Sequence, residues 1–180
     1  MKTILFALLM VLGLGANAQV TKVTLQASGL TCSMCSKAVL NALKQVPSVN
    51  DVRVDIKNQQ YHISFKEGAE IDFDALSKAV EDAGFSVATL EVTANLEQVK
   101  LNKDEHIKIG GVYFHFLNGN GQELNGTTSF TLVDKSFTTA KKHKKYSAMS
   151  KKECVQTGRM AKCCTKDESA EGTRVYHAII

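Results

Sequence analysis

Hydrophobic and polar residues along positions 20–92 follow two different periods. Alternation at every second residue predicts strands, whereas apolar side chains three and four positions apart predict helices. The resulting strands and helices, in chain order, cover residues 20–27, 35–46, 52–56, 61–65, 73–83 and 85–92. Pro47 ends the first helix, Asp72 caps the second and Gly84 follows its last turn. This order predicts an α+β fold, a ferredoxin-like β-α-β-β-α-β sandwich with both helices on one face of a four-stranded sheet.

The rest of the chain shows mainly strand-like alternation and predicts a small, mainly antiparallel β module after the sandwich. Its strands are expected near residues 96–101, 106–109, 112–117, 130–134 and 174–180. Residues 118–121 and Asn125-Gly126 are turn sequences, and a short helix is expected near 138–146. We expect a barrel of about OB size. No linker rich in Gly, Ser or Pro separates the halves, so the boundary is placed at 93–95.

The N-terminus has the pattern of a secretory signal. Lys2 precedes an apolar run over residues 4–14, and Ala16-Asn17-Ala18 fits a cleavage site. The apolar run is too short to span a bilayer and no longer one follows, so stable membrane insertion after cleavage is not expected. The organisation expected is a signal peptide at 1–18 and domains at 19–93 and 94–180. The protein is therefore predicted to be periplasmic or secreted, where disulfides can form.

The charge distribution gives no sign of a nucleic-acid partner. The chain has 22 Lys and Arg against 18 Asp and Glu, and these are spread along its length. The one basic run, residues 141–145, is short, and we interpret it as a solvated helix face. The sequence also lacks G-x-S-x-G, H-E-x-x-H and phosphate-loop motifs, so no enzyme is predicted.

The candidate chemistry centres on Cys32 and Cys35, which lie between the first predicted strand and the first predicted helix. Unpaired backbone N–H groups and the positive end of the helix dipole favour thiolates at a helix N-terminus. Two neighbouring thiolates suit a soft ion such as Cu(I), and with only two ligands the ion stays open to exchange with a partner. Hg(II) would also suit this pair, whereas Zn(II) prefers four ligands.

Two other interpretations of this pair are considered. A disulfide between Cys32 and Cys35 would close a very short loop and stabilise little. A thiol–disulfide oxidoreductase also uses C-x-x-C between a strand and a helix. Thioredoxin-like proteins support that pair with a distant cis-proline, and the one proline here, Pro47, ends the same helix. Metal binding is the favoured interpretation.

Residues 20–92 resemble a known family. The run Gly29-Leu30-Thr31-Cys32-x-x-Cys35, followed by helix, hairpin and Ala83-Gly84-Phe85, is similar to the heavy-metal-associated (HMA) domain. This family includes copper chaperones, modules of copper-transporting ATPases and the periplasmic mercury-binding protein. The resemblance implies that Cys32 and Cys35 are metal ligands, that Phe85 lies close to the metal loop, and that the partner is a metal-donor or metal-acceptor protein such as a transporter. Leu30 departs from the Met that the family commonly has there.

A second group of soft side chains lies in the C-terminal half. Cys154, Cys163 and Cys164 could form a second metal site, or Cys154 could form a disulfide with one of the adjacent pair. His115 and His143 are interpreted as a strand-face residue and a solvated residue. The sequence as a whole predicts an exported soft-metal-binding protein, with Cu(I) as the expected ion, for chaperoning, scavenging or sensing. The alternatives are a thiol–disulfide oxidoreductase, an Hg(II)- or Zn(II)-binding protein, and an adaptor whose β module docks a transporter.

Overall fold

The structure is a computed structural model that describes residues 18–162 and 171–180. The predicted signal peptide, apart from Ala18, lies outside the described residues, and so do Cys163 and Cys164. No helix among the described residues has the length and apolar character needed to cross a membrane.

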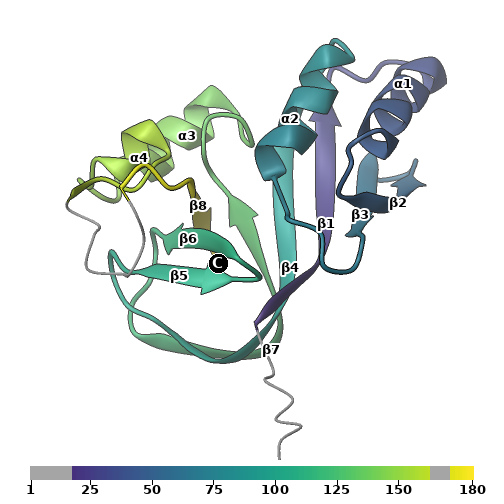
Figure 1. Cartoon of the computed structure of the whole chain (residues 1–180). Coiled ribbons are helices and arrows are strands. Elements are labelled where there is room, and N and C mark those ends of the chain that lie inside the picture. The colour runs from purple at the N-terminus through teal and green to yellow at the C-terminus, as the bar shows by residue number, and fades with distance from the viewer. Residues whose placement is uncertain (1–17, 163–170) are drawn as a thin grey trace, which may run out of the picture.

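The first half has the predicted ferredoxin-like order, and the α+β fold class is confirmed. Its elements are β1 (Gln19–Ser28), α1 (Ser33–Lys44), β2 (Val49–Asp55), β3 (Gln60–Phe65), α2 (Phe73–Asp82) and β4 (Ser86–Leu101). Strand β1 pairs antiparallel with both β3 and β4, and β2 pairs with β3. Figure 1 shows α1 and α2 side by side on one face of this sheet.

The sequence explains where these two helices begin and end. Cys32 is the N-cap of α1, whose buried face contains Val39 and Leu43. Asp72 caps α2 by accepting hydrogen bonds from the backbone N–H groups of the next turn. Gly84 follows α2 with a φ of +88°, a left-handed conformation that glycine adopts without steric cost. Helix α2 ends within one residue of its predicted bound, whereas α1 ends at Lys44, two residues before the predicted 46. The N-terminus of α1 lies at the cysteine loop.

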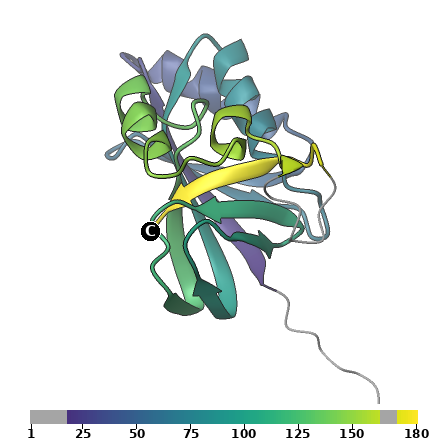
Figure 2. The ribbon, with the colours of Figure 1, turned by 90° about the vertical axis from the view of Figure 1, so that its left-hand side faces the viewer.

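The second half continues the same sheet. It consists of β5 (His106–Ile109), β6 (Val112–Phe116), β7 (Gln122–Leu132), α3 (Ala140–Ser147), α4 (Cys154–Thr157) and β8 (Val175–Ile179). The strand order among the described residues is β2-β3-β1-β4-β7-β8-β6-β5. The pairs are antiparallel, as predicted, except for β6 with β8, which run parallel. Figure 2 shows β8 in yellow among the green strands of this half.

Two expectations about this half were wrong. The strands do not close a separate OB-like barrel, because β4 runs on through residues 93–95 to Leu101 and pairs with β7 along the way. This pairing covers an edge of β4 that would otherwise expose its backbone groups. Asn125-Gly126 is not a turn but part of β7, where Gly126 has a φ of +75° next to a register shift between β4 and β7. The glycine here accommodates a bulge rather than a hairpin turn.

The two halves also share one hydrophobic core. Phe73 of α2 packs edge-on against Tyr176 of β8, with ring centroids 5.0 Å apart, and lies 6.0 Å from the ring of Phe114 on β6. Arg174, just before β8, forms two charged hydrogen bonds to Asp74 at 2.6 and 3.0 Å. Because neighbouring residues of a strand point to opposite faces, the residues that follow Phe114 and Tyr176 face away from this core.

The opposite face of β6 and β8 has its own smaller hydrophobic cluster, which includes α4. Its members are Leu117, Val133, Cys154, Val155, Met160 and Val175. Helix α3 contributes no buried residue, which confirms the prediction that the basic run at 141–145 is a solvated helix face. Helix α4 thus covers His115 and His177, which follow Phe114 and Tyr176.

Candidate metal loop and a buried histidine–cysteine cluster

The loop between β1 and α1 is held from two sides. Ser28 at the end of β1 pairs with Ser86 at the start of β4 through a 2.7 Å hydrogen bond between their hydroxyls. Gly29 has a φ of +87°, and a Cβ atom at this glycine would lie 3.7 Å from the Phe85 ring. Phe85 therefore lies close to the loop. Beneath the first turn of α1, the buried Tyr61 donates a hydrogen bond to the carbonyl of Ser36 at 3.2 Å.

The structure brings Cys32 and Cys35 together at the exposed N-terminus of α1. Their sulfur atoms lie 2.7 Å apart. The backbone N–H of Cys35 donates to the Sγ atom of Cys32 at 3.3 Å, so this sulfur is the side-chain cap of the helix. Met34, between them, is 70% exposed and does not pack on the protein. The two sulfurs are thus presented to solvent from a backbone that the sheet holds in place.

The electrostatics of the loop favour a thiolate. The Cys32 side chain lowers the pKa of Cys35 below the value of an ordinary thiol, and the backbone of Thr31 acts in the same direction. The lowered pKa enlarges the thiolate fraction of Cys35, and the thiolate is the form that binds a metal ion or attacks a disulfide. The donor set, two thiol groups with no histidine or carboxylate beside them on the loop, suits a soft ion better than a hard one.

We expect the pKa of Cys35 to depend on the side chain at position 32. A lower pKa means a larger thiolate fraction, so Cys35 should be alkylated by iodoacetamide at lower pH than a free thiol. Cys32→Ala removes the hydrogen bond to Cys35 and should move this pH profile upward, whereas Cys32→Ser keeps a donor and should move it less. Peptide mass spectrometry after timed alkylation measures the effect. Identical profiles for wild type and Cys32→Ala would contradict it.

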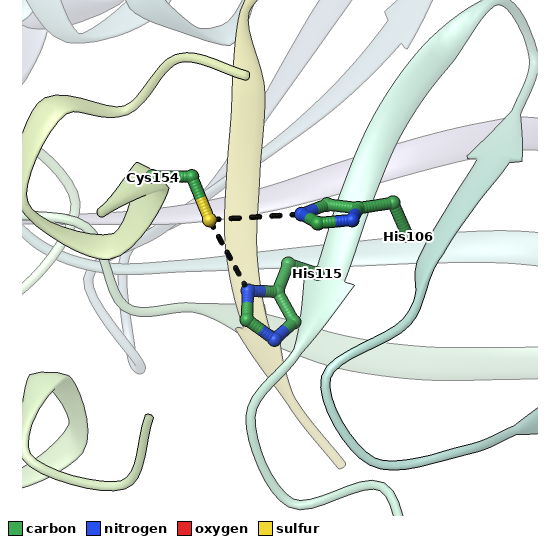
Figure 3. Close-up of side chains that lie close together, drawn as sticks. All are labelled: His106, His115 and Cys154. Carbon is green, nitrogen blue, oxygen red and sulfur yellow. Dashed lines mark hydrogen bonds between the residues drawn. The ribbon is translucent and has the colours of Figure 1, made fainter. Parts of the chain in front are cut away.

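Of the second predicted cysteine group, the structure describes Cys154. Cys163 and Cys164 are outside the described residues, so neither the proposed metal site nor the alternative disulfide between them and Cys154 is tested. Cys154 itself is fully buried on α4, and it lies next to two histidines. Its Sγ atom is 3.6 Å from Nε2 of His106 and 3.7 Å from Nδ1 of His115 (Figure 3).

Sequence reasoning missed this cluster, because it assigned His115 to a strand face and gave His106 no role. The two histidines are direct cross-strand partners in the β5–β6 hairpin, whose turn is Gly110-Gly111. A two-residue Gly-Gly loop fixes such a register, so the pairing was available from the sequence. The parallel pairing of β6 with β8 then places His177 beside His115, which no local pattern indicates.

These histidines are buried, and a carboxylate lies close to His115 and another to His177. Burial lowers the pKa of His115 to about 3, and His177 and His106 act in the same direction. Nδ1 of His177 lies 2.8 Å from a carboxylate oxygen of Asp134. His143, by contrast, is only half-buried and contacts the carbonyl of Val133 through Nδ1 at 3.0 Å. Burial thus favours the neutral form of the His115 ring, which is the form that binds metal ions.

Comparison with known proteins places the first half in a family. The model of the heavy-metal-associated domain matches residues 24–86. The periplasmic component of the mercuric transport system of Serratia marcescens is 36% identical over 63 residues, which are 35% of this chain and 68% of that protein. A probable copper-transporting ATPase of Arabidopsis thaliana is 32% identical over 76 residues, 42% of this chain but 8% of the ATPase.

The structure of oxidized MerP from Ralstonia metallidurans CH34 is 36% identical and covers 39% of this chain and 96% of MerP, with a TM-score of 0.34. A two-cysteine loop on a ferredoxin-like sandwich is the arrangement of a small metal-binding module. The chain belongs to the heavy-metal-associated domain family, through its residues 24–86. It spans a tenth or less of the length of the first ATPases that it matches.

Proposed function

We propose that this chain is an exported soft-metal-binding protein that binds Cu(I) through the thiolates of Cys32 and Cys35. The observation that carries the proposal is the pair of sulfurs 2.7 Å apart at the N-terminus of α1, with Cys32 exposed, Cys35 half-buried and the pKa of Cys35 lowered. Two thiolates neutralise the charge of Cu(I) and leave a net negative site, which the helix N-terminus stabilises. The exposed loop leaves room for a partner's thiol to enter and take the ion. The chain would thus exchange copper with a donor or acceptor such as a transporter.

The comparisons support the metal class without distinguishing its members. Several relatives are copper-transporting ATPases, and another belongs to a mercuric transport system. Both Cu(I) and Hg(II) are soft ions that suit two thiolates. The periplasmic relative and the A-x-A pattern at residues 16–18 support an exported location. Copper is preferred here because most of the named ATPase relatives handle copper.

The test is an anaerobic Cu(I) titration of the reduced chain, in competition with a chromophoric Cu(I) chelator. We expect wild type to compete for one ion at the loop, and the Cys32→Ser, Cys35→Ser double variant to lose that competition. Met34→Leu is the matched control. It changes the exposed soft side chain between the ligands and should leave the affinity unchanged, because Met34 does not contribute a ligand.

Each outcome of this titration has a defined meaning. Equal competition by wild type and the double variant would refute the loop as the copper site. Failure of wild type to compete, together with tight Hg(II) binding that the double variant loses, would assign the loop to mercury. Reduction of insulin disulfides by the metal-free chain, lost in the same variant, would instead support the thiol–disulfide oxidoreductase.

A further inference from the structure

We propose that His106, His115 and Cys154 form a second, buried metal site that binds a divalent transition-metal ion, with Zn²⁺ as its occupant. The three side chains come from β5, β6 and α4, and each is less than a tenth exposed. Their ligand atoms all lie within 4.8 Å of one another. This site is separate from the two-cysteine loop, and the inference does not depend on the proposed copper binding.

The two distances from the sulfur to the ring nitrogens fit a tetrahedral ion. With Zn–S near 2.3 Å and Zn–N near 2.0–2.1 Å, a tetrahedral angle places sulfur and nitrogen about 3.6 Å apart. The measured distances from Cys154 Sγ are 3.6 Å to His106 Nε2 and 3.7 Å to His115 Nδ1 (Figure 3). Both histidines present a ring nitrogen toward the sulfur. An ion would bind between the sulfur and the two nitrogens, and the Cys154 thiol would release its proton to solvent.

The far side of His115 has the support that metal-binding histidines usually have. Its Nε2 atom lies 3.3 Å from a carboxylate oxygen of Asp104, although the alignment is not that of a hydrogen bond. Ser150 donates a 2.6 Å hydrogen bond to that same oxygen, and Lys152 also contacts the backbone of Asp104. A carboxylate behind a ligating imidazole fixes the ring and raises its basicity toward the metal. Asp104 is therefore a positioning residue of the site.

A second observation concerns two buried histidine nitrogens near the proposed site that lack a hydrogen-bond partner among the described residues. His177 lies beside His115, with ring centroids 5.3 Å apart, and is 2% exposed. Its Nε2 atom, like that of His115, has no hydrogen-bond partner among residues 18–162 and 171–180. Burying unpaired polar atoms costs free energy. Neither Nε2 atom is a proposed ligand, so the two atoms mark a polar interior around the site rather than the position of the ion.

The scaffold around the site is rigid. His106 and His115 are opposite each other in a two-strand ladder, so their Cα separation is set by backbone hydrogen bonds. Cys154 begins α4, which the left-handed Gly158 terminates and which packs against Leu117, Val133 and Val175. Ligands fixed on strands and a packed helix keep their geometry before the ion arrives, which favours tight binding.

The test uses the full chain with the loop disabled by Cys32→Ser and Cys35→Ser, reduced with a phosphine. Co²⁺ serves as the spectroscopic probe, because a thiolate-bound tetrahedral Co²⁺ ion absorbs in the visible range, and Zn²⁺ should displace it. We expect one Co²⁺ ion per chain with a sulfur-to-cobalt charge-transfer band. Cys154→Ser should abolish that band, and His106→Gln should weaken binding by well over the roughly 10–100-fold expected for losing an outer partner.

Asp104→Asn changes a residue outside the ligand set, so we expect a partial rather than a complete loss of affinity. Asp104 is partly exposed, so the variant should fold, keep the charge-transfer band and bind Co²⁺ roughly 10–100-fold more weakly. Far-UV circular dichroism checks the fold of each variant. If His106→Gln or Cys154→Ser fails to fold, the Co²⁺ affinity of Asp104→Asn decides whether the proposed metal site stands. Replacing Cys163 and Cys164 by Ser should leave the band intact, since neither belongs to the proposed ligand set.

Three results would overturn the proposal. One is no Co²⁺ or Zn²⁺ binding in the loop-disabled chain, which would mean that Cys154 is a buried thiol hydrogen-bonded to two imidazoles. Another is a spectrum that survives Cys154→Ser or a binding constant that Asp104→Asn does not change. The third is a band lost in the Cys163→Ser, Cys164→Ser variant. Each result leaves the Cu(I) titration of the loop unaffected, so the two proposals fail separately.

Discussion

Replacing Phe73 by Ala should destabilise the whole chain by about 3–5 kcal/mol, the usual cost of removing a fully buried aromatic side chain. The ring of Phe73 is in contact with Phe114 and Tyr176 of the C-terminal half and lies 6.5 Å from Phe65 of its own half. The cavity would therefore open in the core that both halves share. Urea unfolding of the reduced, metal-free chain, followed by far-UV circular dichroism, measures the loss.

The same variant tests whether the halves unfold together. Hydrogen exchange should show that amides of β6 and β8 lose protection along with those of α2, although the substitution is in α2. Phe65→Ala is the matched control, because Phe65 is only partly buried and packs at the edge of this cluster. Phe65→Ala should lower the free energy of unfolding clearly less than Phe73→Ala does. Loss of protection confined to residues 19–93 would contradict a shared core and favour two independent domains.

The N-terminal half could be predicted from sequence because its signals are local. Apolar side chains at helical spacing predicted α1, and Pro47 marked its end. Asp72 and Gly84 did the same for α2. The strands of the hairpin alternate in the ordinary way. The two-cysteine loop could be predicted for the same reason, since two cysteines three residues apart need no long-range contact to be brought together.

The C-terminal half was less predictable because its organisation is non-local. Nothing in residues 86–101 distinguishes a strand that ends at Val92 from one that continues to Leu101; the deciding factor is β7, which pairs with the continuation. The parallel contact of β6 with β8 joins Phe114 to Tyr176, 62 positions later. Strand propensity is set largely by such neighbours rather than by the segment itself.

The histidine–cysteine cluster shows the same limit at the level of a site. The pairing of His106 with His115 follows from the Gly110-Gly111 turn and could be predicted. The position of Cys154 beside these histidines could not be predicted. It depends on how α4 packs over β6 and β8, after a connection of about 20 residues from β7. The sequence interpretation grouped Cys154 with Cys163 and Cys164, which lie outside the described residues, and did not include His106 or His115.

Deletion of residues 175–180, which removes β8, should unfold the C-terminal half. In the sheet order β8 lies between β7 and β6, so without it the β5–β6 hairpin has no strand partner among the described residues. Val175, Tyr176 and Ala178 are all buried, and losing fully buried side chains costs roughly 1.5–3 kcal/mol each for the larger ones. Together with the lost backbone hydrogen bonds of β8, this loss of free energy approaches the whole stability of a typical domain, which is roughly 5–15 kcal/mol.

The control for this deletion is the removal of Ile180 alone. Ile180 is 44% exposed, and its backbone exchanges two hydrogen bonds with the Asn118 side chain. Its removal should therefore lower the free energy of unfolding by about 1–2 kcal/mol. Two-dimensional NMR of the longer deletion should show sharp, dispersed resonances only from residues of the first half, together with a lowered melting temperature, since Phe73 loses Tyr176.

The longer deletion also tests the two proposed metal sites separately, without substituting any of the proposed ligands. The loop carrying Cys32 and Cys35 is held by β1, β4 and Tyr61, none of which contacts β8 directly as a strand partner. Cu(I) competition by the deleted chain should therefore persist at temperatures where the first half is folded. Co²⁺ binding by the loop-disabled version should vanish, because His115 on β6 loses the strand that holds it against α4. A deleted chain that keeps dispersed β5 and β6 resonances would show that β8 is not essential to this part of the sheet, and the parallel β6–β8 ladder would then contribute much less than its burial implies.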